Sequence, residues 1–430
     1  MTKITQTELV PFAVAFKVWT KIGLLSFGGP AGQIATMHRL LVEEKGWLSE
    51  ERYLRALNFC MLLPGPEAQQ LATYAGWMTH GIRGGVAAGL MFVLPGALVM
   101  LLLSFLYAKF GTLPVVEGIF FGIKAAVLAI VAQALLKVGR RALKGQISLA
   151  IAMVAFLSLA VFQIPFPIVV LSAGVLGAVF LSDSSSPPER NASPQNASML
   201  PALISAAMWA LPIALALILL GSDNTVSQLG LFFSKIAVVT FGGAYAVLSY
   251  VGQQAVELYG WMAPGAMLDG LGLAETTPGP LVLVNVFVGF QAGFATGAPF
   301  SPSVGGVLGA LMTLWVTFAP SFLWIFAGAP YLDRIQANPK LSGALSAITA
   351  AVVGVIANLA FWFALQVLFR EQIRINIAWM ELDLPQWSSV NGAALVLTAL
   401  AFVGVFKLKI GLFALIFSAA CGGLLWQTLL

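Results

Sequence analysis

Glycine and proline interrupt the apolar segments of this chain at four places, and each interruption can expose backbone groups that bind an anion. Proline cannot donate a backbone hydrogen bond and glycine is a weak helix former, so a helix should end at each place and a new one begin. The free N–H groups and the positive dipole end of each new helix attract anions. The sequence therefore predicts an oxyanion site at the backbone of Gly28, Gly29, Gly65, Pro66, Gly242, Gly243 and Gly279.

The four interruptions are two copies of one pattern. Phe27-Gly28-Gly29 recurs as Phe241-Gly242-Gly243, and Pro64-Gly65-Pro66 recurs as Pro278-Gly279-Pro280, both at the same separation along the chain. After a short insertion in the second copy, the match resumes at a slightly larger separation, at which Pro95 pairs with Pro320. Glycine and proline in matching apolar segments of a duplicated membrane protein indicate a transporter whose binding site lies between the two copies.

Polar side chains beside the interruptions are the next candidates. Hydroxyl groups can add hydrogen-bond donors to the backbone groups, and those expected to do so are Ser26, Thr240, Thr276 and Thr277. The amides of Asn58, Gln69 and Asn285 could reach the same space.

Charged residues inside apolar segments are costly, and this makes them candidates for function. Lys21 and Lys235 match between the copies, and they either attract the anion along its path or extend to the lipid headgroups. Lys124 lies in the middle of an apolar segment and is interpreted as part of the binding path. Glu67 and Glu275 lie beside the two Pro-Gly-Pro motifs and are candidate proton or coupling sites, although Glu67 could also serve only as a helix cap.

The composition indicates a membrane protein. The chain is 59% hydrophobic and only 9% charged, whereas soluble domains carry roughly 25% charged residues. Long runs rich in leucine, alanine and valine fit helices that cross a hydrocarbon core of about 30 Å. The predicted fold class is an all-α integral membrane protein with an inverted internal repeat and broken or re-entrant helices. We expect roughly nine full spans plus four re-entrant hairpins, or thirteen if all are counted as spans.

Four regions follow from the pattern. They are an N-terminal repeat over 1–181, a polar linker over 182–198, an extra apolar helix over 199–225 and a C-terminal repeat over 226–430. The extra helix makes the number of crossings before the second copy odd, so the second copy should enter the membrane from the opposite side.

Two topologies remain open for the interrupted segments, which either span the membrane or return from its middle as hairpins. Hairpins are favoured because Tyr53–Leu63 and Pro66–Thr79 are each too short to span. Both topologies place the N-terminus in the cytoplasm and the C-terminus in the periplasm. Only the hairpin topology places on the cytoplasmic side a basic cluster that has no equivalent in the second copy. The cluster consists of Arg39, Lys45, Arg52 and Arg55.

Taken together, Phe-Gly-Gly-Pro with the downstream Gly46-Trp47 and Pro-Gly-Pro, and Phe-Gly-Gly with Gly260-Trp261 and Thr-Thr-Pro-Gly-Pro, resemble the chromate ion transporter family. The resemblance extends over nearly the whole chain and is closest to the long, two-domain members. It implies export of chromate across the bacterial inner membrane and resistance to chromate, with sulfate as a related oxyanion. The natural substrate of this chain is left open by the motifs.

A transporter or channel for sulfate or another oxyanion is the alternative function. The sequence has no cluster of histidine, cysteine and carboxylate residues typical of a metal site, no catalytic triad and no nucleotide-binding loop, so we expect neither an enzyme nor a bound cofactor or metal. The expected partners are the anion and the lipid bilayer. Nucleic acid is not expected, since no soluble basic domain is present, and a homodimer is left open.

Overall fold

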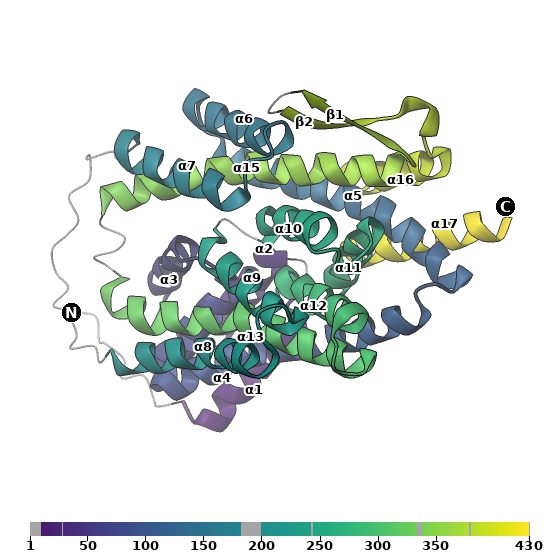
Figure 1. Cartoon of the computed structure of the whole chain (residues 1–430). Coiled ribbons are helices and arrows are strands. Elements are labelled where there is room, and N and C mark those ends of the chain that lie inside the picture. The colour runs from purple at the N-terminus through teal and green to yellow at the C-terminus, as the bar shows by residue number, and fades with distance from the viewer. Residues whose placement is uncertain are drawn as a thin grey trace.

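The computed structural model describes residues 10–27, 29–181, 199–241, 244–332, 338–377 and 380–429. Over these residues the chain forms sixteen α-helices and one β-hairpin (Figure 1). The helices are α1 (Phe12–Leu25), α2 (Gly29–His38), α3 (Glu50–Leu62), α4 (Glu67–Phe110), α5 (Pro114–Ala142), α6 (Gln146–Ala160), α7 (Phe166–Phe180), α8 (Leu200–Leu220), α9 (Thr225–Val239), α10 (Ala244–Gln253), α11 (Pro264–Thr276), α12 (Val284–Thr296), α13 (Pro302–Gly328), α15 (Pro339–Leu368), α16 (Gly392–Phe406) and α17 (Leu412–Leu429).

Six helices in the described residues are long and apolar enough to cross a membrane, and several shorter helices are also apolar. The chain is therefore a multi-pass helical membrane protein, as the composition predicts. The division into nine full spans and four hairpins stays a prediction, because length and composition alone do not place the short helices in a bilayer.

Helix α4 is a hairpin of two helices rather than one long span. The backbone leaves helical geometry at His80 and Gly81, where Gly81 has a φ of 60°. A methyl group on Gly76 would lie 2.3 Å from the carbonyl oxygen of Gly84, a contact that a straight helix could not make. The first half of α4 is thus a short helix of about 20 Å, too short to cross the membrane alone. This agrees with the sequence-based separation of Pro66–Thr79 from the following helix.

Two groups of helices enclose the short helices that lie between the two interruptions of each copy (Figure 1). In one group α15 packs against α5, α6 and α7, and α17 packs against α5. In the other group α13 packs against α4, α8, α9 and α12. The short helices α2, α3, α10 and α11 lie between the groups, where α11 contacts α5 and α10 contacts α15.

Both groups take helices from both copies of the repeat. Pro114 and Pro339, which match each other in the two copies, begin α5 and α15, so equivalent helices pack side by side in the first group. In the second group, α13 packs against the second half of α4, and these two segments also match each other in the repeat. Helix α8, which has no equivalent in the first copy, packs against α13 and α9. The copies are therefore intertwined.

A β-hairpin follows α15 and was not predicted from the sequence. Strands β1 (Gln372–Ile377) and β2 (Met380–Pro385) pair antiparallel. Arg374 Nε lies 2.9 Å from Asp383 Oδ1 across the pair, on an exposed face. The hairpin adds a small polar-faced element at the end of α15 to an otherwise helical fold (Figure 1).

Candidate anion site at the helix interruptions

Every predicted interruption is a break between helices. Helix α1 ends at Leu25 and α2 begins at Gly29, while α3 ends at Leu62 and α4 begins at Glu67. In the second copy α9 ends at Val239 before α10, and α11 ends at Thr276 before a 3-10 turn, Leu281–Leu283, that leads into α12. Gly28, Gly242 and Gly243, which were also predicted as site residues, lie outside the described residues.

Each break of one copy is bonded to a break of the other. The N–H of Gly65 donates to the Thr240 carbonyl at 2.8 Å, and the N–H of Gly279 donates to the Ser26 carbonyl at 2.7 Å. Gly65 matches Gly279 in the repeat and Ser26 matches Thr240. The two bonds are therefore equivalent, and each runs from one copy to the other. Both glycines have left-handed backbones, with φ of 108° at Gly65 and 95° at Gly279, which side-chain-bearing residues rarely adopt. The bonds therefore join the breaks into two pairs, and residues of all four breaks meet at one backbone centre.

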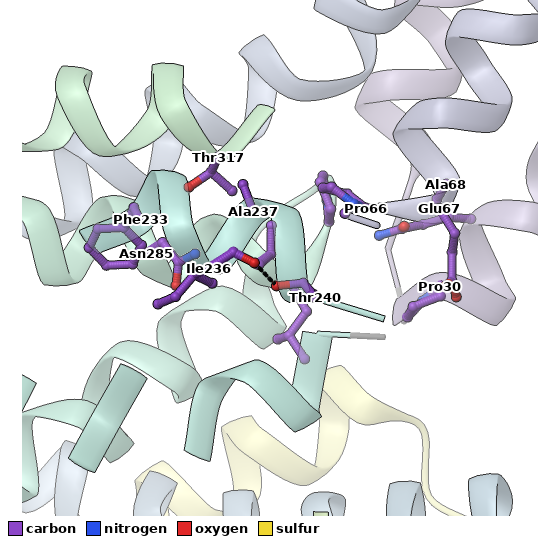
Figure 2. A pocket seen from close by; sticks show the side chains of 15 residues that line it. Pro30, Pro66, Glu67, Ala68, Phe233, Ile236, Ala237, Thr240, Asn285 and Thr317 are labelled. Carbon is purple, nitrogen blue, oxygen red and sulfur yellow. Dashed lines mark hydrogen bonds between the residues drawn. The ribbon is translucent and has the colours of Figure 1, made fainter. Parts of the chain in front are cut away.

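A small pocket with a cavity volume of about 30 Å³ lies at this centre. Figure 2 shows Asn285 and Thr317 on one side of it and Pro30, Pro66 and Glu67 on the other. Three helix starts face it, those of α2, α4 and the turn leading into α12. The lining residues are Pro30, Gln33, Gly65, Pro66, Glu67, Ala68, Phe233, Ile236, Ala237, Thr240, Pro280, Leu281, Val282, Asn285 and Thr317.

Buried polar atoms without protein partners line the pocket. Asn285 is 1% exposed, and neither its amide nitrogen nor its amide oxygen has a hydrogen-bond partner. The Thr317 hydroxyl is also buried and unpartnered. Gln33 donates its Nε2 to the Gly279 carbonyl at 2.6 Å, while its Oε1 remains unpartnered. Burying such groups costs free energy unless a ligand or water satisfies them, so the pocket is suited to a polar guest.

Backbone donors complete the set. The first N–H groups of a helix have no partner within it, and those of α4 start at Glu67, on the wall of the pocket. The same holds for the turn that starts at Leu281. With the Asn285 amide and the Thr317 hydroxyl, they give neutral N–H and O–H donors around a space whose described lining has no lysine, arginine or histidine. Hydrogen bonds and helix dipoles arranged in this way attract anions.

The four hydroxyls predicted from the sequence are already engaged. Ser26 donates to the Ile22 carbonyl at 2.6 Å, and Thr240 donates to the Ile236 carbonyl at 2.7 Å (Figure 2). Thr276 and Thr277 likewise both donate to Leu273. These hydroxyl hydrogens are bonded within their own helices, so in this structure Thr240 offers the pocket an acceptor rather than a donor.

The predicted charged residues lie in different places. Glu67 lines the pocket, whereas Glu275 is buried outside it and accepts a hydrogen bond from the Tyr245 hydroxyl. Lys21 and Lys235 are exposed and do not line the pocket. Of the amides, Asn58 is exposed and Gln69 is buried outside the pocket, so of the three predicted amides the structure brings Asn285 alone to its wall.

Lys124 takes part in a partly buried ion pair that sequence reasoning missed. Its Nζ lies 3.3 Å from Asp269 Oδ1, and the Tyr107 hydroxyl donates to Asp269 Oδ2 at 2.8 Å. Asp269 is on α11, Lys124 on α5 and Tyr107 on α4, so the cluster links a short helix to both groups of long helices. A lone aspartate between Leu268 and Gly270 is a signal that could have found it, since intramembrane carboxylates are rare.

The polar lining does not follow the repeat. The residues that match Gln33, Asn285, Thr317 and Glu67 in the other copy are Val247, Leu71, Phe92 and Leu281, all apolar. Leu71 and Phe92 are fully buried. The duplication therefore supplies two backbone crossings, but the polar residues of this pocket have apolar counterparts in the other copy.

The fold is that of a multi-pass membrane protein, and the pocket is its candidate site for a small polar solute. The chromate transporter family model matches residues 13–178 and 227–424, and the chain belongs to this family. It is 33% identical to the chromate transport protein of Pseudomonas aeruginosa, with 81% of each chain covered. It is 31% identical to a probable chromate transport protein of Synechococcus elongatus, covering 79% of this chain and 81% of the relative. The chain is thus a transporter and not an enzyme.

A third relative agrees with the other two. The chromate transport protein of Cupriavidus metallidurans is 29% identical, with 79% of each chain covered. No solved structure matches the chain.

Proposed function

We propose that the chain exports chromate, a tetrahedral dianion, across the bacterial inner membrane and so confers chromate resistance. Family membership supports an oxyanion substrate. The observation that carries the proposal is the pocket at Gly65 and Thr240, which gathers helix starts from both copies and the unpartnered polar atoms of Gln33, Asn285 and Thr317. A small oxyanion offers several acceptors to such converging donors.

The architecture proposed for this function is an inverted repeat with re-entrant segments. The two backbone bonds exchanged by the repeat support an internal two-fold relation, and the fold-back of α4 supports breaks at mid-membrane depth. Broken backbone at that depth is stable only where it lines a cavity or is buried in protein, as it is here. We place the N-terminus in the cytoplasm and the C-terminus in the periplasm because the basic cluster between the first two breaks belongs inside.

The membrane potential favours export of a dianion. One charge crossing the membrane is worth about 2.3 kcal/mol per 100 mV. At a potential of about 100 mV, negative inside, a dianion that leaves the cell therefore gains about 4.6 kcal/mol. At about 1.4 kcal/mol per tenfold ratio, this potential sustains a gradient of roughly three orders of magnitude. Export by this route needs no other energy source.

The test is flux in proteoliposomes of the purified full-length protein. We expect chromate trapped inside to leave faster when the interior is made negative with a potassium diffusion potential, and to saturate with concentration as a transporter does. Liposomes without protein are the control. Potential-independent leakage equal to that of the control would contradict the proposal.

Sulfate is the alternative substrate, because neutral donors do not distinguish one tetrahedral dianion from another. Adding sulfate at increasing concentration to the same assay distinguishes a chromate transporter from a general oxyanion transporter. Competition at concentrations similar to chromate would identify a general oxyanion transporter, whereas chromate flux that persists in excess sulfate would support chromate as the substrate.

Thr317→Val and Asn285→Leu are expected to weaken chromate binding by roughly tenfold to a hundredfold each. A hydrogen bond to a charged group is worth about 1.5–3 kcal/mol, and each substitution removes one such bond while it keeps the approximate side-chain volume. The measurement is chromate affinity by isothermal titration of the protein in nanodiscs. Thr398→Val is the matched control, because the Thr398 hydroxyl on α16 is also buried and unpartnered but lies outside the pocket. Equal loss in the control would assign the effect to general destabilisation.

A further inference from the structure

Glu67 is the only ionisable side chain among the described residues that line the pocket. It is the first residue of α4 and lies at the same wall as Pro30 and Pro66 (Figure 2). The residue that matches it in the other copy, Leu281, also lines the pocket but carries no charge. The repeat therefore does not impose a carboxyl group at this position, and the one present here lies on the pocket wall.

A carboxylate and a dianion cannot share this pocket as they stand. Like charges in a poorly solvated space disfavour each other's ionised form, so an anion beside Glu67 favours the protonated carboxyl group. No cation in the described lining can compensate instead. The lining residues from α2, α9, α12 and α13 are neutral, and Lys235 on α9 is exposed outside the pocket.

The remaining titratable groups near Glu67 do not supply a positive charge either. Cys60 on α3 is buried and within electrostatic range of Glu67, but its ionised form would be negative. Glu275 on α11 is outside the pocket and holds the Tyr245 hydroxyl. The available counter-charge is therefore a proton, taken up from water on the side of the membrane from which the anion enters.

We propose that Glu67 binds a proton together with the oxyanion and donates its O–H group to it. This rests on the proposed function of the pocket and adds a coupling rule to it. The carboxylate takes one proton from water as the anion arrives, the neutral carboxyl donates a hydrogen bond in the loaded state, and the proton leaves with the anion on the other side. One net negative charge then crosses per dianion instead of two.

The first test compares the pH dependence of chromate affinity in the wild type and in Glu67→Gln, measured by titration of the full-length protein in nanodiscs. The affinity of the wild type is expected to fall by about tenfold more per pH unit than that of the glutamine variant at alkaline pH, because one additional proton is linked to binding. Protonation of chromate itself affects both proteins equally, so the ratio isolates Glu67. Parallel pH profiles would overturn the proposal.

A second variant separates the donor from the shape of the side chain. Glu67→Leu introduces the residue found at the matching position 281 and should bind chromate at least about tenfold more weakly than Glu67→Gln, since it is neutral but cannot donate. Glu117→Gln, at an exposed carboxylate on α5, is the control and should keep the wild-type profile. Should Glu275→Gln abolish the pH dependence while Glu67→Gln preserves it, the proton site would be Glu275 and the proposal would be wrong.

The second readout is charge stoichiometry. Reversal potentials of chromate flux in proteoliposomes should correspond to one net charge per chromate for the wild type and two for Glu67→Gln. Two charges for both proteins would overturn the coupling rule while leaving chromate transport intact. No chromate binding or flux by either protein would instead reject the proposed function, so the two failures are distinguishable.

Discussion

Asp269→Asn is expected to lower the free energy of unfolding by about 3 kcal/mol, the lower part of the range for breaking a buried ion pair. The Asp269 carboxylate is 4% exposed and is held by Lys124 and Tyr107. Its removal leaves the Lys124 ammonium without its counter-charge, although the lysine side chain is 27% exposed and keeps part of its solvation. The midpoint of thermal unfolding, followed by tryptophan fluorescence in detergent, should fall clearly.

The double variant Lys124→Met with Asp269→Asn is expected to recover most of this loss, because neither charge then remains unpaired. Asp383→Asn in the β-hairpin is the control, since its partner Arg374 is exposed and a surface pair is worth about 1 kcal/mol or less. The double variant also tests the sequence-based interpretation of Lys124. Wild-type chromate affinity in this variant would assign Lys124 to the ion pair, and a large loss of affinity in a stable protein would assign it to anion binding.

The breaks were predictable because their cause is local. Proline lacks an N–H group and glycine is a weak helix former, so the combined Pro-Gly-Pro motifs favour a helix end at Gly65 and Gly279. The single prolines Pro95 and Pro320, by contrast, lie inside α4 and α13. The repeat added that these points are equivalent. What it could not show is which break bonds to which, because the bonds of Gly65 to Thr240 and Gly279 to Ser26 join residues far apart in sequence and depend on how the two groups of helices pack.

The polar lining was predictable only in part, because hydrogen-bond partners are a tertiary property. Ser26 and Thr240 carry hydroxyl groups that could donate to an anion, but these hydroxyls donate instead to carbonyls one turn earlier. Serine and threonine commonly form this bond in helices. Gln33 and Thr317 escaped notice, since nothing in their local sequence marks them as facing a pocket. Two other features did have a local signal that was not used.

Those signals were the isolated charge of Asp269 and the alternation of the β-hairpin. Ile373, Ile375 and Ile377 alternate with polar residues, which is the period of a half-buried strand rather than a helix. The strand pairing follows from that period. Both cases show that a strongly apolar composition hides short departures from the helical pattern.

Gly65→Ala and Gly279→Ala are each expected to reduce chromate flux by more than about tenfold while the protein still inserts and folds. A non-glycine residue at a φ of 108° or 95° is strained by about 1–3 kcal/mol. The added carbon would lie 3.2 Å from Gln70 Nε2 at position 65 and 3.1 Å from Leu283 at position 279. The backbone that carries the bond to the opposite break must therefore move, and the helix starts that face the pocket move with it. Flux in proteoliposomes at matched protein content is the measurement.

Gly221→Ala separates this effect from backbone strain. Gly221 ends α8 with a φ of 85°, and an added methyl group would find no atom within 4 Å. It therefore carries a similar conformational cost with no contact to the breaks, so we expect lower stability but near-normal flux per folded protein. The difference between this control and the two break variants measures how much transport depends on the geometry of the crossing. Equal losses in all three would mean that strain alone impairs transport, and near-normal flux in Gly65→Ala would remove the crossing from the transport site.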